Sequence, residues 1–261
     1  MGLYNPMMKT GRYWKDQGIV LKSINFGELD RIVTLFTRKK GKINVIAKGA
    51  RKVGNRFGPA LDCPAISNFM FYDGRGMPVL SQAEIVDCYR EIGKKTNQWV
   101  FANYLLFAID RCYEPEESDE RIFETVLFYL DLSTKCENFY ILALKFRIDL
   151  IRFLGFLPRI RSCAVCGKPF KKIPQGWSVA SGGMICEKCF SSIADIHYLP
   201  PDMMTLLAKL MTFSCASCLS IQLRENQFAY LDRLVSEYLT YHVGKKITEW
   251  KIFLERFQEA S

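Results

Sequence analysis

Histidine is scarce in this chain of 261 residues, which contains only His197 and His242. Neither histidine begins the His-x-Glu that precedes the cysteine pair of a zinc deaminase. The sequence also has no Gly-rich phosphate loop of the Walker type and no dinucleotide-binding fingerprint. We therefore expect no catalytic activity from this chain alone.

Long apolar runs are missing as well. A charged residue interrupts every apolar run within about 20 residues, so no segment is expected to span a bilayer. The chain opens with Met1-Gly2-Leu3-Tyr4 and shows no apolar signal-peptide core. Both absences predict a cytoplasmic protein without a membrane partner, in a reducing compartment where disulfides do not persist.

Cysteine is plentiful, and four of the ten cysteines form two Cys-x-x-Cys pairs. Cys163 and Cys166 precede Cys186 and Cys189 at a spacing that lets two tight turns surround one tetrahedral Zn²⁺. Four thiolates close the coordination shell, so we expect one structural zinc ion in a ribbon. Two disulfides or a thioredoxin-type redox pair are the alternatives. A redox motif, however, needs only one pair.

A third pair, Cys215 and Cys218, lies beside apolar residues that recur at helical spacing. Free cysteine is among the most frequently buried residue types. We therefore expect these two side chains to pack in a core instead of binding a metal.

The positive charge is concentrated at one end of the chain. The net charge is +9, and residues 1–80 hold 14 Lys and Arg against 5 Asp and Glu, whereas residues 81–261 balance to zero. No acidic residue occurs between Arg31 and Leu61. This run favours a surface that binds a polyanion, and the alternative is a solvated basic face without a partner. The expected DNA contacts are Arg38, Lys39, Lys40, Lys42, Lys48, Arg51, Lys52 and Arg56, with Phe57 as a face for base stacking.

The fold class expected from these patterns is α+β with several domains. Five short stretches rich in β-branched and aromatic residues, at 18–24, 31–37, 42–47, 65–72 and 78–83, indicate a five-stranded OB-fold barrel. From about residue 95 the apolar period becomes helical. The expected parts are an N-terminal extension (1–15), the OB-fold domain (16–84), a first helical part (85–157), the zinc ribbon (158–198) and a second helical part (199–261).

Three sequence segments resemble the RecO family of bacterial recombination mediators: Gly27–Thr37, Ala47–Arg51, and Arg152–Pro158 leading into Cys163. The resemblance covers about residues 16–243. It implies a protein of DNA repair and recombination in the RecF pathway, without catalytic activity, that binds single- and double-stranded DNA, anneals complementary strands and is associated with the nucleoid. It also implies work with RecR and contact with the acidic tail of single-stranded-DNA-binding protein (SSB), which helps to load RecA. Residues 1–15 and the third cysteine pair depart from the family pattern.

Two further interpretations concern partners. Lys145 and Arg152 lie seven residues apart on an expected helix, so their basic heads could flank an apolar groove for the SSB tail, or they could be ordinary exposed charges. An RNA-binding or transcription-associated module could use the same OB fold and ribbon. A nucleotidyl transferase would need a Lys-x-Asp-Gly motif, which the sequence lacks.

Overall fold

The computed structural model describes residues 12–62, 64–74, 76–171, 174 and 176–260. The chain divides into two compact units. The first, here the barrel unit, comprises the chain up to Arg90 together with Tyr113–Glu124. The second, the helical unit, comprises Glu91–Cys112 and the chain from Thr125 onward.

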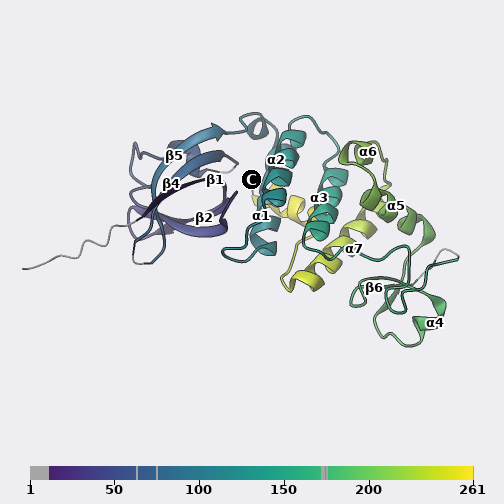
Figure 1. Ribbon diagram of the computed structural model, residues 1–261. Helices are drawn as coiled ribbons and strands as arrows, with labels where there is room; N and C mark the ends of the chain where they lie inside the picture. The colour runs from purple at the N-terminus through teal and green to yellow at the C-terminus, as the bar shows by residue number, and fades with distance from the viewer. Residues whose placement is uncertain (1–11, 63, 75, 172–173, 175, 261) are drawn as a thin grey trace, which may run out of the picture. The chain divides into compact units, whose positions relative to one another are not determined.

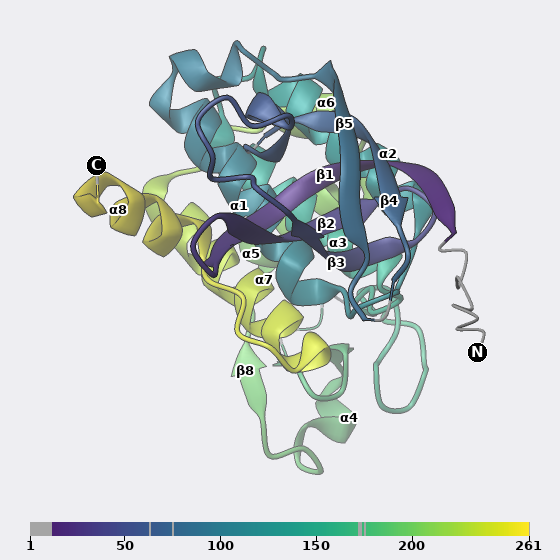
Figure 2. The same ribbon diagram turned by 90° about the vertical axis from the view of Figure 1, so that its left-hand side faces the viewer.

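Five strands close into a barrel in the barrel unit (Figure 1). They are β1 (Tyr13–Phe26), β2 (Asp30–Thr37), β3 (Gly41–Ala47), β4 (Ile66–Tyr72) and β5 (Val79–Asp87), in the order β1-β2-β3-β5-β4. Neighbouring strands are antiparallel except β3 and β5, which run parallel. Figure 2 shows β4 and β5 side by side along this barrel. The five strands confirm the expected α+β class with an N-terminal barrel.

The strand β1 begins at Tyr13, inside the segment expected to be an extension. Tyr13 pairs with Tyr72 and Asp16 with Phe69, so the last residues of that segment belong to the sheet. The rest of the expected extension, residues 1–11, lies outside the described residues. The barrel core is built from alternating apolar side chains of the five strands: Val20, Val33, Leu35, Ile43, Val45, Phe69, Phe71 and Leu80.

The turn between β2 and β3 depends on Gly41, whose φ is +66°. A Cβ atom at this position would lie 1.9 Å from the carbonyl oxygen of Glu117. We expect Gly41→Ala to destabilise the protein, because the left-handed backbone costs about 1–2 kcal/mol and overpacking about 1–3 kcal/mol more. Urea unfolding measures the loss. Gly54→Ala is the matched control, since Gly54 has φ +69° with nothing within 4 Å of its Cβ position. Equal losses in the two variants would refute the steric argument.

The helical unit is organised around α3 (Phe139–Phe153), which packs against α1 (Thr96–Cys112), α5 (Pro201–Thr212), α6 (Cys215–Leu219), α7 (Glu225–Val243) and α8 (Trp250–Ala260). Asn138 caps α3, because its side-chain oxygen accepts a hydrogen bond from the Ile141 N–H at 3.2 Å. The helix ends at Phe153, and Gly155, just beyond the C-cap Leu154, takes the left-handed conformation with φ +82°. A further helix, α2, spans Glu120–Ser133 and begins within the stretch assigned to the barrel unit. Among the described residues, none of the helices combines the length and the apolar composition that a membrane span requires.

Between α3 and α5 the chain forms a small ribbon of three strands. They are β6 (Gly176–Ser178), β7 (Gly183–Ile185) and β8 (Ile196–Tyr198), in the order β7-β6-β8, with a short helix α4 (Glu187–Phe190) between β7 and β8. The buried Trp177 packs against Tyr238 of α7 at 5.5 Å between ring centroids. The Tyr238 hydroxyl donates a hydrogen bond to the Phe156 carbonyl at 2.8 Å. These contacts attach the ribbon to α7.

Candidate metal centre and nucleic-acid surface

The four cysteines of the two Cys-x-x-Cys pairs converge in the ribbon. Their sulfur atoms all lie within 4.8 Å of one another. The first pair belongs to a hairpin in which Ser162 bridges to Pro169 and Gly167 takes the left-handed conformation with φ +72°. The second pair begins where β7 ends, at Cys186, which is the N-cap of α4.

The spacing of the sulfurs fits a tetrahedral ion. Four sulfurs at about 2.3 Å from a central Zn²⁺ are about 3.8 Å apart. The Cys166 and Cys186 sulfurs are 3.8 Å apart, far beyond the length of a disulfide bond. The described cysteines are free, and all four of these thiols share one cluster. This arrangement suits a metal site better than the two disulfides or the single redox pair considered from the sequence.

The electrostatics of the cluster also favour a cation. Burial raises the pKa of Cys163, but backbone N–H groups of Cys166, Cys186 and Val165 outweigh it and lower this pKa to about 6. The pKa of Cys189 is raised to about 12, chiefly through its hydrogen bond with Cys186. The hydrogen bonds among the thiols, and to a lesser degree the charge of Cys163, thus oppose ionisation of Cys189. A divalent cation would favour the ionised form of all four thiols, and the cluster could hold such an ion.

The predicted DNA-contact residues separate into two groups in the structure. The exposed group consists of Lys39, Lys40, Lys48, Arg51, Lys52 and Arg56. Among the described residues, none of these six forms an ion pair with an acidic side chain. Lys40 lies over the Trp14 ring at 4.6 Å, and Arg56 lies over the Phe57 ring at 5.0 Å. Their positive charge therefore remains available to an anion.

The loop that carries four of these residues is attached to the β1–β2 turn. The Asp30 carboxylate accepts a hydrogen bond from the Gly49 N–H at 2.7 Å. The Arg51 guanidinium donates to the carbonyls of Gly27 at 3.2 Å and Glu28 at 2.8 Å. Arg51 thus braces the loop, while Lys48, Lys52 and Arg56 project their charges from it.

The second group, Arg38 and Lys42, has polar partners inside the barrel unit, and contact of these two residues with DNA stays a prediction. Arg38 forms ion pairs with Glu120, at 3.0 Å, and with Glu124. Desolvation lowers its pKa, but these two carboxylates outweigh it, so the pKa is raised. The Lys42 ammonium donates to the Tyr113 carbonyl at 3.0 Å. Both side chains therefore hold the segment Tyr113–Glu124 against the barrel.

Phe57 does not provide the expected stacking face. Its side chain is only 3% exposed, because it packs in the barrel core at the start of the 3₁₀ helix Gly58–Leu61. The sequence reasoning missed two exposed rings on β1, Tyr13 at 61% and Phe26 at 48% exposure. Phe26 immediately precedes the turn to which Arg51 is bonded, so it is a better candidate for base stacking.

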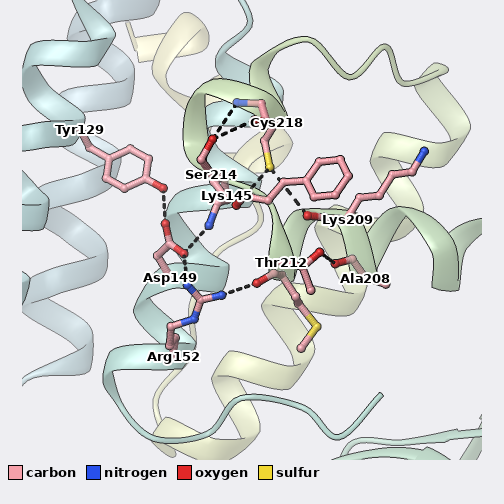
Figure 3. A network of polar contacts seen from close by, with 12 residues as sticks. Tyr129, Lys145, Asp149, Arg152, Ala208, Lys209, Thr212, Ser214 and Cys218 are labelled. Atoms are coloured by element: carbon pink, nitrogen blue, oxygen red, sulfur yellow. Dashed lines mark hydrogen bonds and ion pairs between the residues drawn. The ribbon is translucent and has the colours of Figure 1, made fainter. Parts of the chain in front are cut away.

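The expected groove between Lys145 and Arg152 is also corrected. Lys145 is 2% exposed, and its ammonium donates to the Asp149 carboxylate at 2.5 Å (Figure 3). The other oxygen of Asp149 accepts from the Tyr129 hydroxyl at 2.7 Å. Arg152 is partly exposed, but it lies 3.5 Å from Asp149 and donates to the Met211 carbonyl. Lys145 is therefore an internal ion-pair partner and cannot meet a peptide at the surface.

The third cysteine pair is buried, as expected. Cys215 and Cys218 lie on the short helix α6, and burial raises the pKa of Cys215 to about 11. Burial also raises the pKa of Cys218. Both remain protonated near neutral pH and act as packing groups.

Comparison with known proteins agrees with these features. Residues 8–89 match the family model "Recombination protein O N terminal", and residues 96–251 match "Recombination protein O C terminal". A protein from Caldanaerobacter subterraneus subsp. tengcongensis, named DNA repair protein RecO, is 29% identical over 234 residues, covering 89% of this chain and 94% of the relative. Proteins of the same name from Shouchella clausii and Listeria monocytogenes serotype 4a are 32% and 25% identical, covering 67% and 92% of this chain and 68% and 94% of the relatives. The chain therefore belongs to the RecO family of DNA repair proteins.

Proposed function

We propose that this protein is a non-enzymatic recombination mediator that binds DNA through its barrel and anneals complementary strands without ATP. The observation that carries the proposal is the group of exposed basic side chains without acidic partners on the described part of the barrel unit. Such a surface attracts the phosphate backbone irrespective of base sequence. Neutralising the repulsion between two strands favours their pairing, so the reaction needs no nucleotide site.

The four-cysteine cluster has a structural role in this proposal. We propose that it holds one Zn²⁺, ligated by Cys163, Cys166, Cys186 and Cys189. The separation of 3.8 Å between two of the sulfurs supports zinc. Four thiolate ligands leave no open coordination position for water, which supports a structural and not a catalytic role for the zinc ion.

Protein partners form the last part of the proposal. We propose cooperation with RecR, contact with the acidic SSB tail and help in loading RecA in the RecF pathway, on the strength of family membership. Of the two residues first considered for the tail, Arg152 alone remains a candidate, because its side chain is 44% exposed.

The DNA-binding proposal is tested through the salt dependence of single-stranded DNA binding. We expect a variant with Lys39, Lys48, Lys52 and Arg56 all replaced by Gln to have a flatter log-log slope. The expected change is about 0.7 for each phosphate that the variant no longer neutralises, or about 3 in all. Arg51 is left intact because it braces the loop. Fluorescence anisotropy of a labelled oligonucleotide at several salt concentrations measures the slope.

The matched control removes the same charge from the helical unit. Lys94, Arg224, Arg233 and Lys251 have solvent-accessible side chains and lie within 4.0 Å of acidic partners. Their replacement by Gln should leave the slope nearly unchanged. Equal slopes in the two variants would contradict the barrel site. A preference for RNA over DNA of the same sequence would instead favour an RNA-binding module.

A further inference from the structure

The ribbon is strongly basic, a feature hidden by the neutral balance of residues 81–261. Residues 158–198 contain six basic residues and two acidic ones. A zinc ion bound by four thiolates carries a net charge of minus two, so the loaded ribbon still keeps an excess of positive charge. The acidic residues that balance this charge lie chiefly in residues 113–124, which belong to the barrel unit. The helical unit has a net charge of +6, and the ribbon contributes +4 of it.

The basic side chains that the structure describes in the ribbon have no partners within the described part of the chain. Five of them are exposed: Arg159, Arg161, Lys168, Lys171 and Lys188. In the described residues no ion pair or side-chain hydrogen bond involves any of these five. Asp195, one of the two acidic residues, accepts hydrogen bonds from the Ser178 hydroxyl at 2.9 Å and the Ala180 N–H at 3.1 Å. The ribbon therefore does not neutralise itself.

Three solvent-accessible cations of the helical unit outside the ribbon, by contrast, have acidic partners. The solvent-accessible cations Lys94, Arg233 and Lys251 each lie beside a glutamate, at 2.5, 2.7 and 3.4 Å. Unpaired like charges repel one another and oppose folding unless an anion offsets them. Exposed cations without an acidic partner among the described residues also occur on the helices, at Arg111 of α1 and Lys209 of α5, but the ribbon gathers five of them within residues 159–188.

Three of the ribbon cations share one small hairpin, residues 161–171, which we name the ribbon hairpin. Its two sides are joined by hydrogen bonds from the Phe170 N–H to the Arg161 carbonyl at 3.3 Å and from the Cys163 N–H to the Lys168 carbonyl at 2.9 Å. Arg161, Lys168 and Lys171 therefore project from a backbone held by hydrogen bonds and by the cysteine cluster. A pre-organised backbone lowers the entropic cost of binding a ligand.

We propose that the ribbon hairpin is a second binding surface for the DNA phosphate backbone, separate from the barrel surface. This inference rests on the proposed DNA-binding function and deepens it. With two cationic surfaces, one chain can hold two strands at once, which is what annealing without ATP requires. The expected ligand is the phosphate backbone, whose oxygens accept hydrogen bonds from Lys and Arg irrespective of base sequence.

The test uses full-length, zinc-loaded protein. We expect Arg161→Gln, Lys168→Gln and Lys171→Gln combined to reduce the salt slope for single-stranded DNA by about 2, at about 0.7 for each cation removed. The control variant carries Lys94→Gln, Arg233→Gln and Lys251→Gln, which remove the same charge from paired positions. The annealing rate of complementary strands should fall in the ribbon variant and stay unchanged in the control.

Zinc content separates this proposal from its main rival, in which the cations only offset the negative charge of the thiolates. A ribbon variant with full zinc and an unchanged slope would overturn the proposal. If the variant loses zinc, its slope no longer reports on the cations alone. Lysine acetylation of the wild-type protein then distinguishes DNA binding by the hairpin from simple charge compensation. Oligothymidine should protect Lys168 and Lys171 but leave Lys94 and Lys251 reactive, and equal reactivity with and without DNA would overturn the proposal.

The variant with Lys39, Lys48, Lys52 and Arg56 replaced by Gln, here the barrel variant, distinguishes failure of the barrel site from failure of the ribbon site. A flatter slope in the ribbon variant but not in the barrel variant would refute the barrel site and leave the ribbon site standing. A flatter slope in the barrel variant alone would refute the ribbon site and leave the barrel site standing. Additive changes in the combined variant are expected, because two independent surfaces neutralise separate phosphates.

Discussion

Replacing Arg147 by Met is expected to lower the free energy of unfolding by about 3–5 kcal/mol, the typical cost of leaving one partner of a buried ion pair alone. Arg147 and Asp232 are both fully buried and form an ion pair between α3 and α7. The guanidinium also donates to the Ser236 hydroxyl at 2.5 Å and the Ala143 carbonyl at 3.2 Å. Without Arg147, the Asp232 carboxylate stays buried with no cation beside it. Urea unfolding followed by circular dichroism measures the loss.

A second substitution distinguishes the effect of charge from the effect of packing. Asp232 accepts hydrogen bonds from the backbone N–H groups of Trp250 at 3.1 Å and Lys251 at 3.0 Å, so it also fixes the start of α8. Asp232→Asn removes the charge and keeps an acceptor oxygen. The double variant Arg147→Met with Asp232→Asn should be more stable than Arg147→Met alone. A strictly additive loss would show that packing, and not the unpaired carboxylate, determines the effect.

Removal of zinc by a chelator is expected to unfold the ribbon while the barrel stays folded. Binding of a structural zinc ion contributes about 10–16 kcal/mol of apparent free energy in small zinc-finger peptides, and the ribbon has only three short strands of its own in its described residues. Trp177, now 1% exposed, should become accessible to water, which shifts its fluorescence to longer wavelength. Limited proteolysis should cut within residues 158–198 first.

Substitution of a ligand provides the matched comparison. Cys189→Ser should release zinc, because it removes one of four ligands, whereas Cys88→Ser, outside the cluster, should retain one zinc ion per chain. DNA binding by the barrel surface should persist in both variants. Retention of a full zinc ion by Cys189→Ser would contradict the four-thiolate site.

The sequence was most informative where the determinants are local. The two Cys-x-x-Cys pairs each form a tight turn, so their spacing alone predicts the cluster. The strands were recognisable from β-branched runs such as Ile32–Phe36, although the start of β1 was missed because Tyr13–Gln17 is largely polar. That stretch is a strand because it pairs with β4, more than 50 residues away, which no local propensity reveals.

Charged residues were harder to assign than apolar ones. The pairing of Arg38 with Glu120 and Glu124 joins residues more than 80 positions apart, so the acid-free stretch around Arg38 does not reveal it. Lys145 did offer a signal. Apolar residues occupy every face of α3 around Lys145. This pattern indicates a central helix, in which the few charged side chains are buried beside partners.

The junction between β3 and β5 has a consequence for how the barrel opens. These strands meet at a single residue pair, Ile46 with Val79, supported by a hydrogen bond from the Ile46 N–H to the Pro78 carbonyl at 2.9 Å. The chain from Lys48 to Arg56, which follows β3 directly, crosses from this junction toward the β1–β2 turn. The free energy of local unfolding is lowest where two strands share the fewest hydrogen bonds. The barrel therefore opens most easily between β3 and β5, next to the loop of exposed cations. A polyanion bound to that loop would stabilise the closed barrel, so DNA binding should raise the free energy of unfolding.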